Sequence, residues 1–172
     1  MTDLSPLVPA AAELIALCTA RGLTIATAES CTGGLIAGLL TEVPGSSAVV
    51  ERGFVTYSNL AKTELLGVAK SMLDDQRIGA VSEETALAMA EGALKRSDAD
   101  LVVAVTGIAG PTGGTPAKPV GLVHFAAQKR GGIAHHAERR FGAIGRSAVR
   151  LATVREALAM LRDLIDQAGA TP

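Results

Sequence analysis

The chain has 172 residues, with 16 basic and 17 acidic side chains and a formal net charge of -1 at pH 7, so it offers no positively charged surface for nucleic acid. One tyrosine and three phenylalanines are too few for the aromatic platform of a single-strand-binding sheet, and no apolar run reaches the length of about 18 residues that a membrane helix needs. The length fits one domain over residues 1–172, and two cysteines without disulfide or metal-ligand spacing favour a cytoplasmic location.

The first predicted elements are a helix, a short strand and a second helix. Apolar residues at spacings of three and four predict an amphipathic helix over Ser5–Arg21, which ends at Gly22. Cys18 lies on the apolar face of this helix, so we interpret it as a small core residue rather than a reactive thiol. The run Leu23–Ala26 then predicts a buried strand, and Leu35–Leu40 predicts a buried helix.

The stretch between that strand and that helix, Thr27–Gly34, reads Thr-Ala-Glu-Ser-Cys-Thr-Gly-Gly and is central to the functional prediction. Backbone N–H groups at the start of a helix are unpaired and favour an anion or an oxyanion. Ser30 therefore lies where a nucleophile could act beside such a group. The alternative is that a serine or threonine here only caps the helix.

The next segment combines a strand with a short helix that contains a lysine. Ala48–Tyr57 predicts a strand with Gly53 as a bulge, and a cap at Ser58 or Asn59 starts the helix. Lys62 lies in the first turns of this helix, where the positive end of the helix dipole favours loss of the ammonium proton. This position suits a general base, and the alternative is a solvated surface lysine.

A loop, a helix, a strand and a second polar loop follow. Residues 69–81 have no clear period and predict a loop, whereas Ser82–Arg96 predicts a helix capped by its serine. The five apolar residues Leu101–Val105 are typical of a central strand covered on both faces. The glycine-rich stretch Thr106–Thr115 follows at the carboxyl end of that strand, where α/β sheets bind ligands. It has neither Walker nor dinucleotide-binding spacing, and the alternative is a flexible surface turn.

The last third of the chain predicts a hairpin and a long helix. Pro119–Ala127 and Ile133–Phe141 predict two strands, the second a polar edge strand, and Gly145–Gln167 predicts a helix whose apolar stripe serves the core or a dimer seam. Arg146 and Arg150 near the start of this helix could hold a phosphate, and the alternative is that both are surface arginines. The three histidines show no ligand pattern with Asp, Glu or Cys, so we expect no metal site.

Three of these segments can form one site. In a mostly parallel α/β sheet the strand ends gather at one edge, which would bring together Ser30, the Tyr57–Lys62 segment and Thr106–Thr115. Ser30 lacks the spacings of the Gly-x-Ser-x-Gly and Ser-x-x-Lys enzymes, but a lysine from elsewhere can act as its base. The pKa of that lysine must then be lowered from about 10.4 by burial or by a neighbouring cation. Cys31 is the rival nucleophile, and we rank it below Ser30 because it has no evident histidine partner.

Several motifs, in order along the chain, resemble one family. They are Thr27–Gly34, Glu51–Asn59 with Lys62, Gly79–Ser82, Thr106–Pro111 with Gly113 and Gly114, and Lys118–Gly121. Over about residues 8–165 the chain closely resembles the CinA-like C-terminal domain family. The resemblance implies a three-layer α/β/α sandwich with a mostly parallel, mixed central sheet. It also implies the activity assigned to members of this family, the hydrolysis of nicotinamide mononucleotide to nicotinate mononucleotide and ammonia.

The resemblance further implies roles for individual residues. Ser30 would be the nucleophile, Lys62 its base, and Tyr57 a nearby group that orients the reactants or donates a proton. The implied substrate contacts are Glu29, Cys31, Thr32, Gly33, Gly34, Thr106, Gly107, Ile108, Ala109, Gly110 and Arg146. No cofactor is implied, the expected partner is a small pyridine mononucleotide rather than nucleic acid or a membrane, and a homodimer is favoured.

Two other functions stay open at this point. Some members of the resembled family have been discussed for competence or DNA-damage roles, so the domain could be a non-catalytic nucleotide-binding or interaction module. A different small amide or phosphoester could also be the substrate, because these residues determine the type of reaction better than the ring that is recognised. The family includes longer proteins in which this domain follows an N-terminal domain, and we expect this chain to be the stand-alone form.

Overall fold

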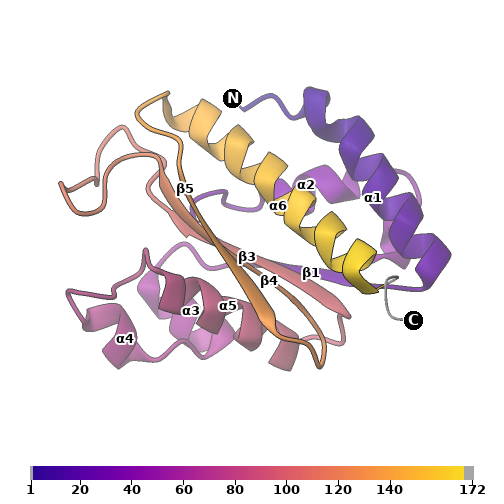
Figure 1. Ribbon diagram of the computed structural model, residues 1–172, viewed down its shortest axis with the longest axis horizontal. Helices are drawn as coiled ribbons and strands as arrows, with labels where there is room; N and C mark the ends of the chain where they lie inside the picture. The colour runs from indigo at the N-terminus through magenta and orange to yellow at the C-terminus, as the bar shows by residue number, and fades with distance from the viewer. Residues whose placement is uncertain (1, 169–172) are drawn as a thin grey trace.

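The computed structural model describes residues 2–168 and has a five-stranded sheet between two layers of helices (Figure 1). The strands are β1 (Ile25–Glu29), β2 (Val50–Val55), β3 (Leu101–Gly107), β4 (Leu122–Lys129) and β5 (Ala134–Arg140). The helices are α1 (Val8–Arg21), α2 (Leu35–Thr41), α3 (Asn59–Leu66), α4 (Lys70–Asp74), α5 (Glu83–Lys95) and α6 (Arg146–Ala168). The α/β/α sandwich implied by the resemblance is confirmed.

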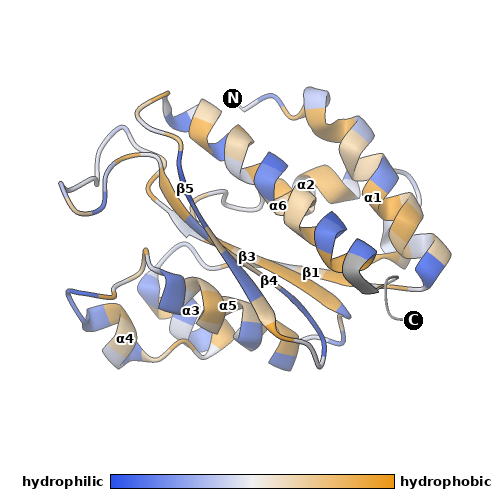
Figure 2. Cartoon of the chain, viewed as in Figure 1, coloured by the Kyte–Doolittle hydropathy of each residue, from blue (hydrophilic) through white to orange (hydrophobic). Residues whose placement is uncertain are grey.

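The sheet is mixed and has the order β2-β1-β3-β4-β5. β1 pairs in parallel with β2 and β3, whereas β4 pairs antiparallel with β3 and β5 pairs antiparallel with β4. The predicted hairpin and polar edge strand are therefore present, and Figure 2 shows β5 as largely hydrophilic beside the apolar strands. The parallel part of the sheet is confined to its first three strands.

Each face of the sheet is covered by its own group of helices. Helices α1, α2 and α6 pack on one face, and α3, α4 and α5 pack on the other (Figure 1). All five residues of β1 are buried, with Ile25 in one apolar cluster and Ala26 in the other. Cys18 is fully buried in α1, as predicted for a core residue. None of the helices in residues 2–168 has both the length and the apolar character needed to cross a membrane.

The connections place a crevice at the carboxyl end of β1. The chain leaves β1 through α2 on one face to reach β2, and then returns through α3, α4 and α5 on the other face to reach β3. Because these crossovers diverge at β1, the strand ends lie at a topological switch point, where α/β sheets bind ligands. Glu29 is paired with Val55 and Val105, so the residues that follow each of these strands lie side by side.

Two local predictions were wrong. The β2 bulge lies at Glu51, because Ile25 pairs with Val50 and the next residue of β1 pairs with Arg52. Gly53 is regularly paired instead, and a Cβ there would lie 3.0 Å from the Cβ of Ala37, so the glycine allows α2 to approach the strand closely. The segment predicted as a loop at 69–81 contains helix α4, which is held to the core by buried Leu73.

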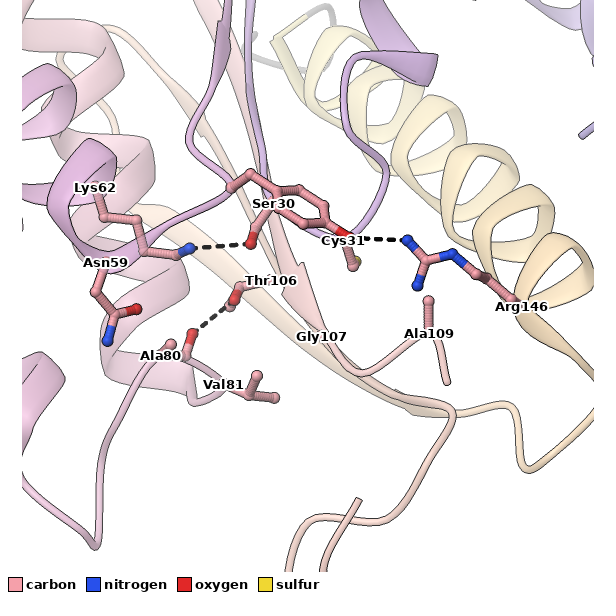
Figure 3. A pocket seen from close by; sticks show the side chains of 11 residues that line it. Ser30, Cys31, Asn59, Lys62, Ala80, Val81, Thr106, Gly107, Ala109 and Arg146 are labelled. Carbon is pink, nitrogen blue, oxygen red and sulfur yellow. Dashed lines mark hydrogen bonds between the residues drawn. The ribbon is translucent and has the colours of Figure 1, made fainter. Parts of the chain in front are cut away.

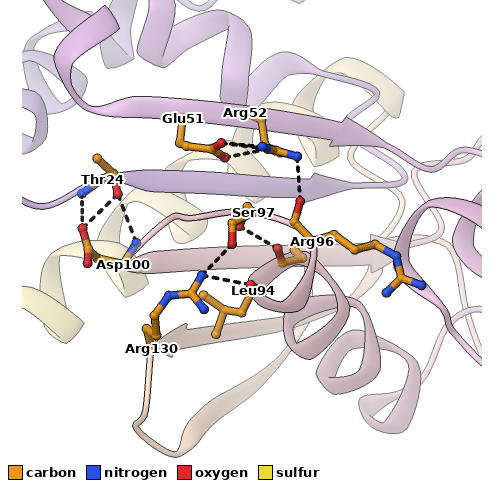
Figure 4. Close-up of polar contacts among 9 residues, drawn as sticks. Thr24, Glu51, Arg52, Leu94, Arg96, Ser97, Asp100 and Arg130 are labelled. Carbon is orange, nitrogen blue, oxygen red and sulfur yellow. Dashed lines mark hydrogen bonds and ion pairs between the residues drawn. The ribbon is translucent and has the colours of Figure 1, made fainter.

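Polar contacts close the opposite end of the sheet, away from this crevice (Figure 4). Arg130, in the turn between β4 and β5, donates hydrogen bonds to the carbonyl oxygens of Leu94, Ser97 and Ala99. The side chain of Asp100 accepts hydrogen bonds from the backbone and the hydroxyl of Thr24. These contacts satisfy carbonyl groups at the end of α5 and join β1 to β3, so they stabilise the scaffold.

Candidate active site

A serine and a lysine meet at the carboxyl end of β1. Ser30 follows the last residue of β1, and Lys62 lies in α3, which is capped by the Ser58 hydroxyl. The Nζ atom of Lys62 lies 2.9 Å from Oγ of Ser30 and donates a 2.8 Å hydrogen bond to the carbonyl oxygen of Thr56 (Figure 3). The lysine side chain is 1% exposed, so this contact is shielded from water. The two predicted residues are therefore within hydrogen-bond distance.

The environment of Lys62 favours its neutral form. Burial lowers the pKa of the Lys62 amine from its ordinary value near 10.5 to about 8. Of the causes that the sequence suggested, which were the helix dipole, burial and a neighbouring cation, burial is the main one. A neutral amine can keep its N–H bond to Thr56 and direct its lone pair at the Ser30 hydroxyl. This arrangement suits proton transfer from a nucleophile to a base.

A cavity of about 240 Å³ opens beside the serine and the lysine (Figure 3). Its lining residues that the sequence singled out are Ser30, Cys31, Tyr57, Lys62, Thr106, Gly107, Ala109 and Arg146. Sequence reasoning missed three further lining residues, Asn59, Ala80 and Val81. Asn59 lies within the predicted Tyr57–Lys62 segment, and Ala80 and Val81 lie within the Gly79–Ser82 motif of the family resemblance, so both motifs could have revealed these residues.

One wall of the cavity is formed by Thr106, Gly107 and Ala109, at the end of β3 and just after it. The Thr106 hydroxyl donates a 2.6 Å hydrogen bond to the carbonyl oxygen of Ala80, which ties this wall to the segment before α5. Ile108 and Gly110 do not line the cavity. The Ile108 N–H donates a hydrogen bond to the carbonyl oxygen of Leu122 in β4, and the Gly110 carbonyl accepts one from Arg146. Both residues therefore contact parts of the protein around the cavity without lining it.

Arg146 reaches the mouth of the cavity from the start of α6. Its Nη1 donates a 3.1 Å hydrogen bond to the Gly110 carbonyl, and its Nη2 donates a 2.8 Å hydrogen bond to the hydroxyl of Tyr57 (Figure 3). Tyr57 is 60% exposed, so this pair lies at the solvent-accessible side of the cavity. A charged guanidinium in that place can meet an anionic group of a bound molecule.

Glu29 is not positioned as a substrate contact, contrary to the expectation from the resemblance. Its fully buried carboxylate accepts hydrogen bonds from the N–H groups of Gly34, Ile36 and Ala37, at 3.0, 3.0 and 2.8 Å. These are unpaired donors at the start of α2, and Gly34 has no side chain with which to cap them. Glu29 therefore holds α2 in place and does not line the cavity.

The turn after Ser30 is held by contacts within the protein and does not line the cavity beyond Cys31. The N–H of Gly33 donates a 3.0 Å hydrogen bond to the Ser30 carbonyl, and Arg150 donates a 2.6 Å hydrogen bond from Nη2 to the Thr32 carbonyl. Within residues 2–168, the Thr32 N–H donates no hydrogen bond and the Cys31 N–H contacts only its own thiol. Both N–H groups follow Ser30 directly in the turn, and Cys31 also lines the cavity.

Comparison with known proteins assigns the family. The family model described as the CinA C-terminal domain matches residues 8–165. The chain belongs to the CinA family. The CinA-like protein of Syntrophus aciditrophicus is 54% identical over 158 residues, which are 91% of this chain and 36% of that protein. The CinA-like protein of Mycolicibacterium vanbaalenii is 51% identical, again over 36% of its length, so the chain spans about a third of these curated relatives.

Solved structures of CinA-family proteins have the same fold. The competence/damage inducible protein CihA from Agrobacterium tumefaciens is 59% identical, with a TM-score of 0.89 over 92% of this chain and 94% of that one. A competence-damaged protein (CinA) superfamily protein from Escherichia coli is 37% identical, with a TM-score of 0.86 over 95% of this chain and 93% of that one. The mixed five-stranded sandwich of this CinA domain is thus the fold of its relatives.

Cys31 of this CinA domain is a poor nucleophile despite its position beside Ser30. Burial raises the pKa of its thiol to about 12, so the reactive thiolate is scarce at neutral pH. Ser30 instead has a base at hydrogen-bond distance. The geometry and the charges therefore favour the Ser30 hydroxyl over the Cys31 thiol as the nucleophile, which is the order in which the sequence ranked them.

Proposed function

We propose that this CinA domain is an amidohydrolase that converts nicotinamide mononucleotide to nicotinate mononucleotide and ammonia through a serine acyl-enzyme. The observation that carries the proposal is the 2.9 Å contact between Lys62 Nζ and Ser30 Oγ inside a cavity. The pKa of about 8 for Lys62 supports it, because a lysine near its ordinary pKa would be too rarely neutral to act as a base.

The first half of the reaction forms the acyl-enzyme. Neutral Lys62 accepts the proton of the Ser30 hydroxyl while Oγ forms a bond to the carbonyl carbon of the substrate carboxamide. The tetrahedral intermediate collapses when its C–N bond breaks and the Lys62 ammonium gives its proton to the departing nitrogen, which leaves as ammonia. The products of this half are ammonia, neutral Lys62 and a nicotinoyl ester on Ser30.

The second half returns the enzyme to its starting state. Lys62 takes a proton from a water molecule, whose oxygen forms a bond to the ester carbon. The bond from that carbon to Ser30 Oγ then breaks, and Lys62 returns the proton to the serine oxygen. Nicotinate mononucleotide forms as the carboxylic acid and gives its remaining proton to solvent, so that it leaves as the carboxylate. The same lysine thus acts as base and acid in both halves, since in each half it takes up one proton and gives one back.

The negative charge on the tetrahedral oxygen needs donors close to Ser30. The N–H groups of Cys31 and Thr32 have no backbone acceptor among residues 2–168 and adjoin the nucleophile, so they are the proposed oxyanion donors. At the other end of the substrate, Arg146 at the cavity mouth is the proposed contact for the phosphate. Tyr57 is held by that arginine and would orient the ring or ribose between them.

Ammonia release tests the proposed activity directly. We expect the purified chain to release ammonia from nicotinamide mononucleotide and to form nicotinate mononucleotide in equal amount, with EDTA having no effect on the rate. Nicotinate mononucleotide, which has no carboxamide nitrogen to lose, is the matched control. Tight binding of the mononucleotide without ammonia release would reject catalysis and favour a nucleotide-binding module.

The pH dependence should report the pKa of Lys62. Below pH 8 the ammonium form dominates and cannot accept the Ser30 proton, so we expect kcat/KM to rise with pH and to level off above about 8. The measurement is kcat/KM for ammonia release across pH 6 to 10. A limb that continues to rise towards an ordinary lysine pKa, or a profile flat across this range, would contradict Lys62 as the base.

A further inference from the structure

Arg150 is the arginine that the proposed reaction leaves unused, although it contacts the turn that follows the nucleophile. It lies one helical turn after Arg146 in α6, yet it does not line the cavity. Its Nη2 donates a 2.6 Å hydrogen bond to the carbonyl oxygen of Thr32. A Cβ added to Gly33 would lie 3.6 Å from the same nitrogen, so the guanidinium is packed against this turn.

The peptide group between Thr32 and Gly33 is held at both ends. Its carbonyl oxygen accepts the hydrogen bond from Arg150, and its N–H donates to the Ser30 carbonyl. A peptide group is planar, so two hydrogen bonds on opposite edges restrict its rotation. The Cys31 and Thr32 N–H groups, the proposed oxyanion donors, belong to the two preceding peptide groups of the same turn, so this restriction also limits their rotation.

The burial of Arg150 argues against a purely stabilising role. Its Nε is buried and has no hydrogen-bond partner within the described part of the chain, and the same holds for the hydroxyl of fully buried Thr32. Unpaired buried polar atoms lower stability, and an apolar side chain of similar size would avoid that penalty. An arginine in this place is therefore better explained by what its Nη2 holds than by packing.

We infer that Arg150 is a positioning residue that orients the oxyanion donors of Ser30 by holding the Thr32 carbonyl. The inference rests on the proposed function, since it specifies how that site is kept ready for the reaction. It separates the two arginines near the start of α6, because Arg146 is at the cavity mouth and Arg150 is behind the nucleophile turn.

The test compares Arg150→Met, Arg150→Lys and Arg146→Met, with Arg155→Met at an exposed position of the same helix as the control. In Arg150→Met we expect kcat to fall by about 100-fold through misplaced donors, with KM for nicotinamide mononucleotide and the melting temperature close to wild type. Arg150→Lys keeps one donor and should recover part of kcat. The control variant should match the wild type.

Nicotinamide riboside, which has no phosphate, distinguishes positioning from phosphate binding. Arg150→Met should lower turnover of the nucleotide and the riboside by the same factor, whereas Arg146→Met should affect mainly the nucleotide. A rise in KM for the nucleotide alone in Arg150→Met would make Arg150 a phosphate contact and overturn the inference. A lower melting temperature with unchanged kcat would make it a structural residue and also overturn it.

A reaction that needs no pyridine nucleotide separates this inference from the proposed function. With p-nitrophenyl acetate, Ser30 Oγ would form a bond to the acetyl carbon, Lys62 would take the hydroxyl proton, and p-nitrophenolate would leave. We expect a burst of p-nitrophenolate in wild type that is slower in Arg150→Met and absent in Ser30→Ala. If wild type shows the burst but no ammonia release, the proposed function fails and the inference stands. A burst of equal rate in Arg150→Met, or none in wild type, overturns the inference.

Discussion

Replacing Lys62 by methionine is expected to lower kcat/KM for ammonia release by about 1,000-fold or more, because the Ser30 hydroxyl loses the amine at hydrogen-bond distance that takes its proton. Methionine has nearly the same length and no charge, so it fills the buried site without demanding solvation. The melting temperature should stay near that of wild type, because the variant also removes a buried amine whose charged form is unfavourable.

Ser30→Ala and the double variant complete this experiment. Residues that act as one unit are not additive, so Ser30→Ala combined with Lys62→Met should be no slower than Ser30→Ala alone. Lys70→Met, at an exposed position in the neighbouring α4, is the matched control and should leave turnover unchanged. Additive losses would show that the serine and the lysine act independently, and substantial turnover in Lys62→Met would refute the lysine as the base.

Replacing Gly92 by alanine is expected to destabilise the protein by about 2 kcal/mol and to impair turnover, although alanine is the better helix former. A Cβ at Gly92 would lie 2.0 Å from the carbonyl oxygen of Leu66, which ends α3. The clash is with the backbone and no side-chain rotation relieves it. Helix α3 must move away from α5, and it takes Lys62 with it.

Gly38 provides the matched control for this prediction. It is also a helix-interior glycine, in α2, but a Cβ added there would meet no atom within 4 Å. Gly38→Ala should therefore gain up to about 1 kcal/mol from helix propensity and leave turnover unchanged. Chemical denaturation and ammonia release measured on both variants check the pair. Equal stability changes in the two variants would show that the contact with Leu66 does not restrict α3.

The sequence predicted most of the helices and strands, and it predicted the edge of the sheet at which the candidate site lies. Apolar spacing predicted the helices and strands, because each pattern depends only on residues a few positions apart. The rule that ligands bind at strand ends placed Ser30, Lys62 and Thr106 together, and all three line one cavity in the structure. The errors were local: the β2 bulge was assigned to a glycine, and α4 was hidden in a segment of mixed polarity.

Composition, periodicity and motif spacing by themselves determined the α/β class, the order of the elements and the residue types capable of serine and lysine chemistry. Only the tertiary structure decided that Glu29 faces α2, that Arg150 holds the Thr32 carbonyl, and that Lys62 is buried deeply enough for its pKa to fall. The physical reason is that these properties depend on which distant segments meet and on how much water they exclude. Both follow from sheet register and helix packing, which short-range patterns do not encode.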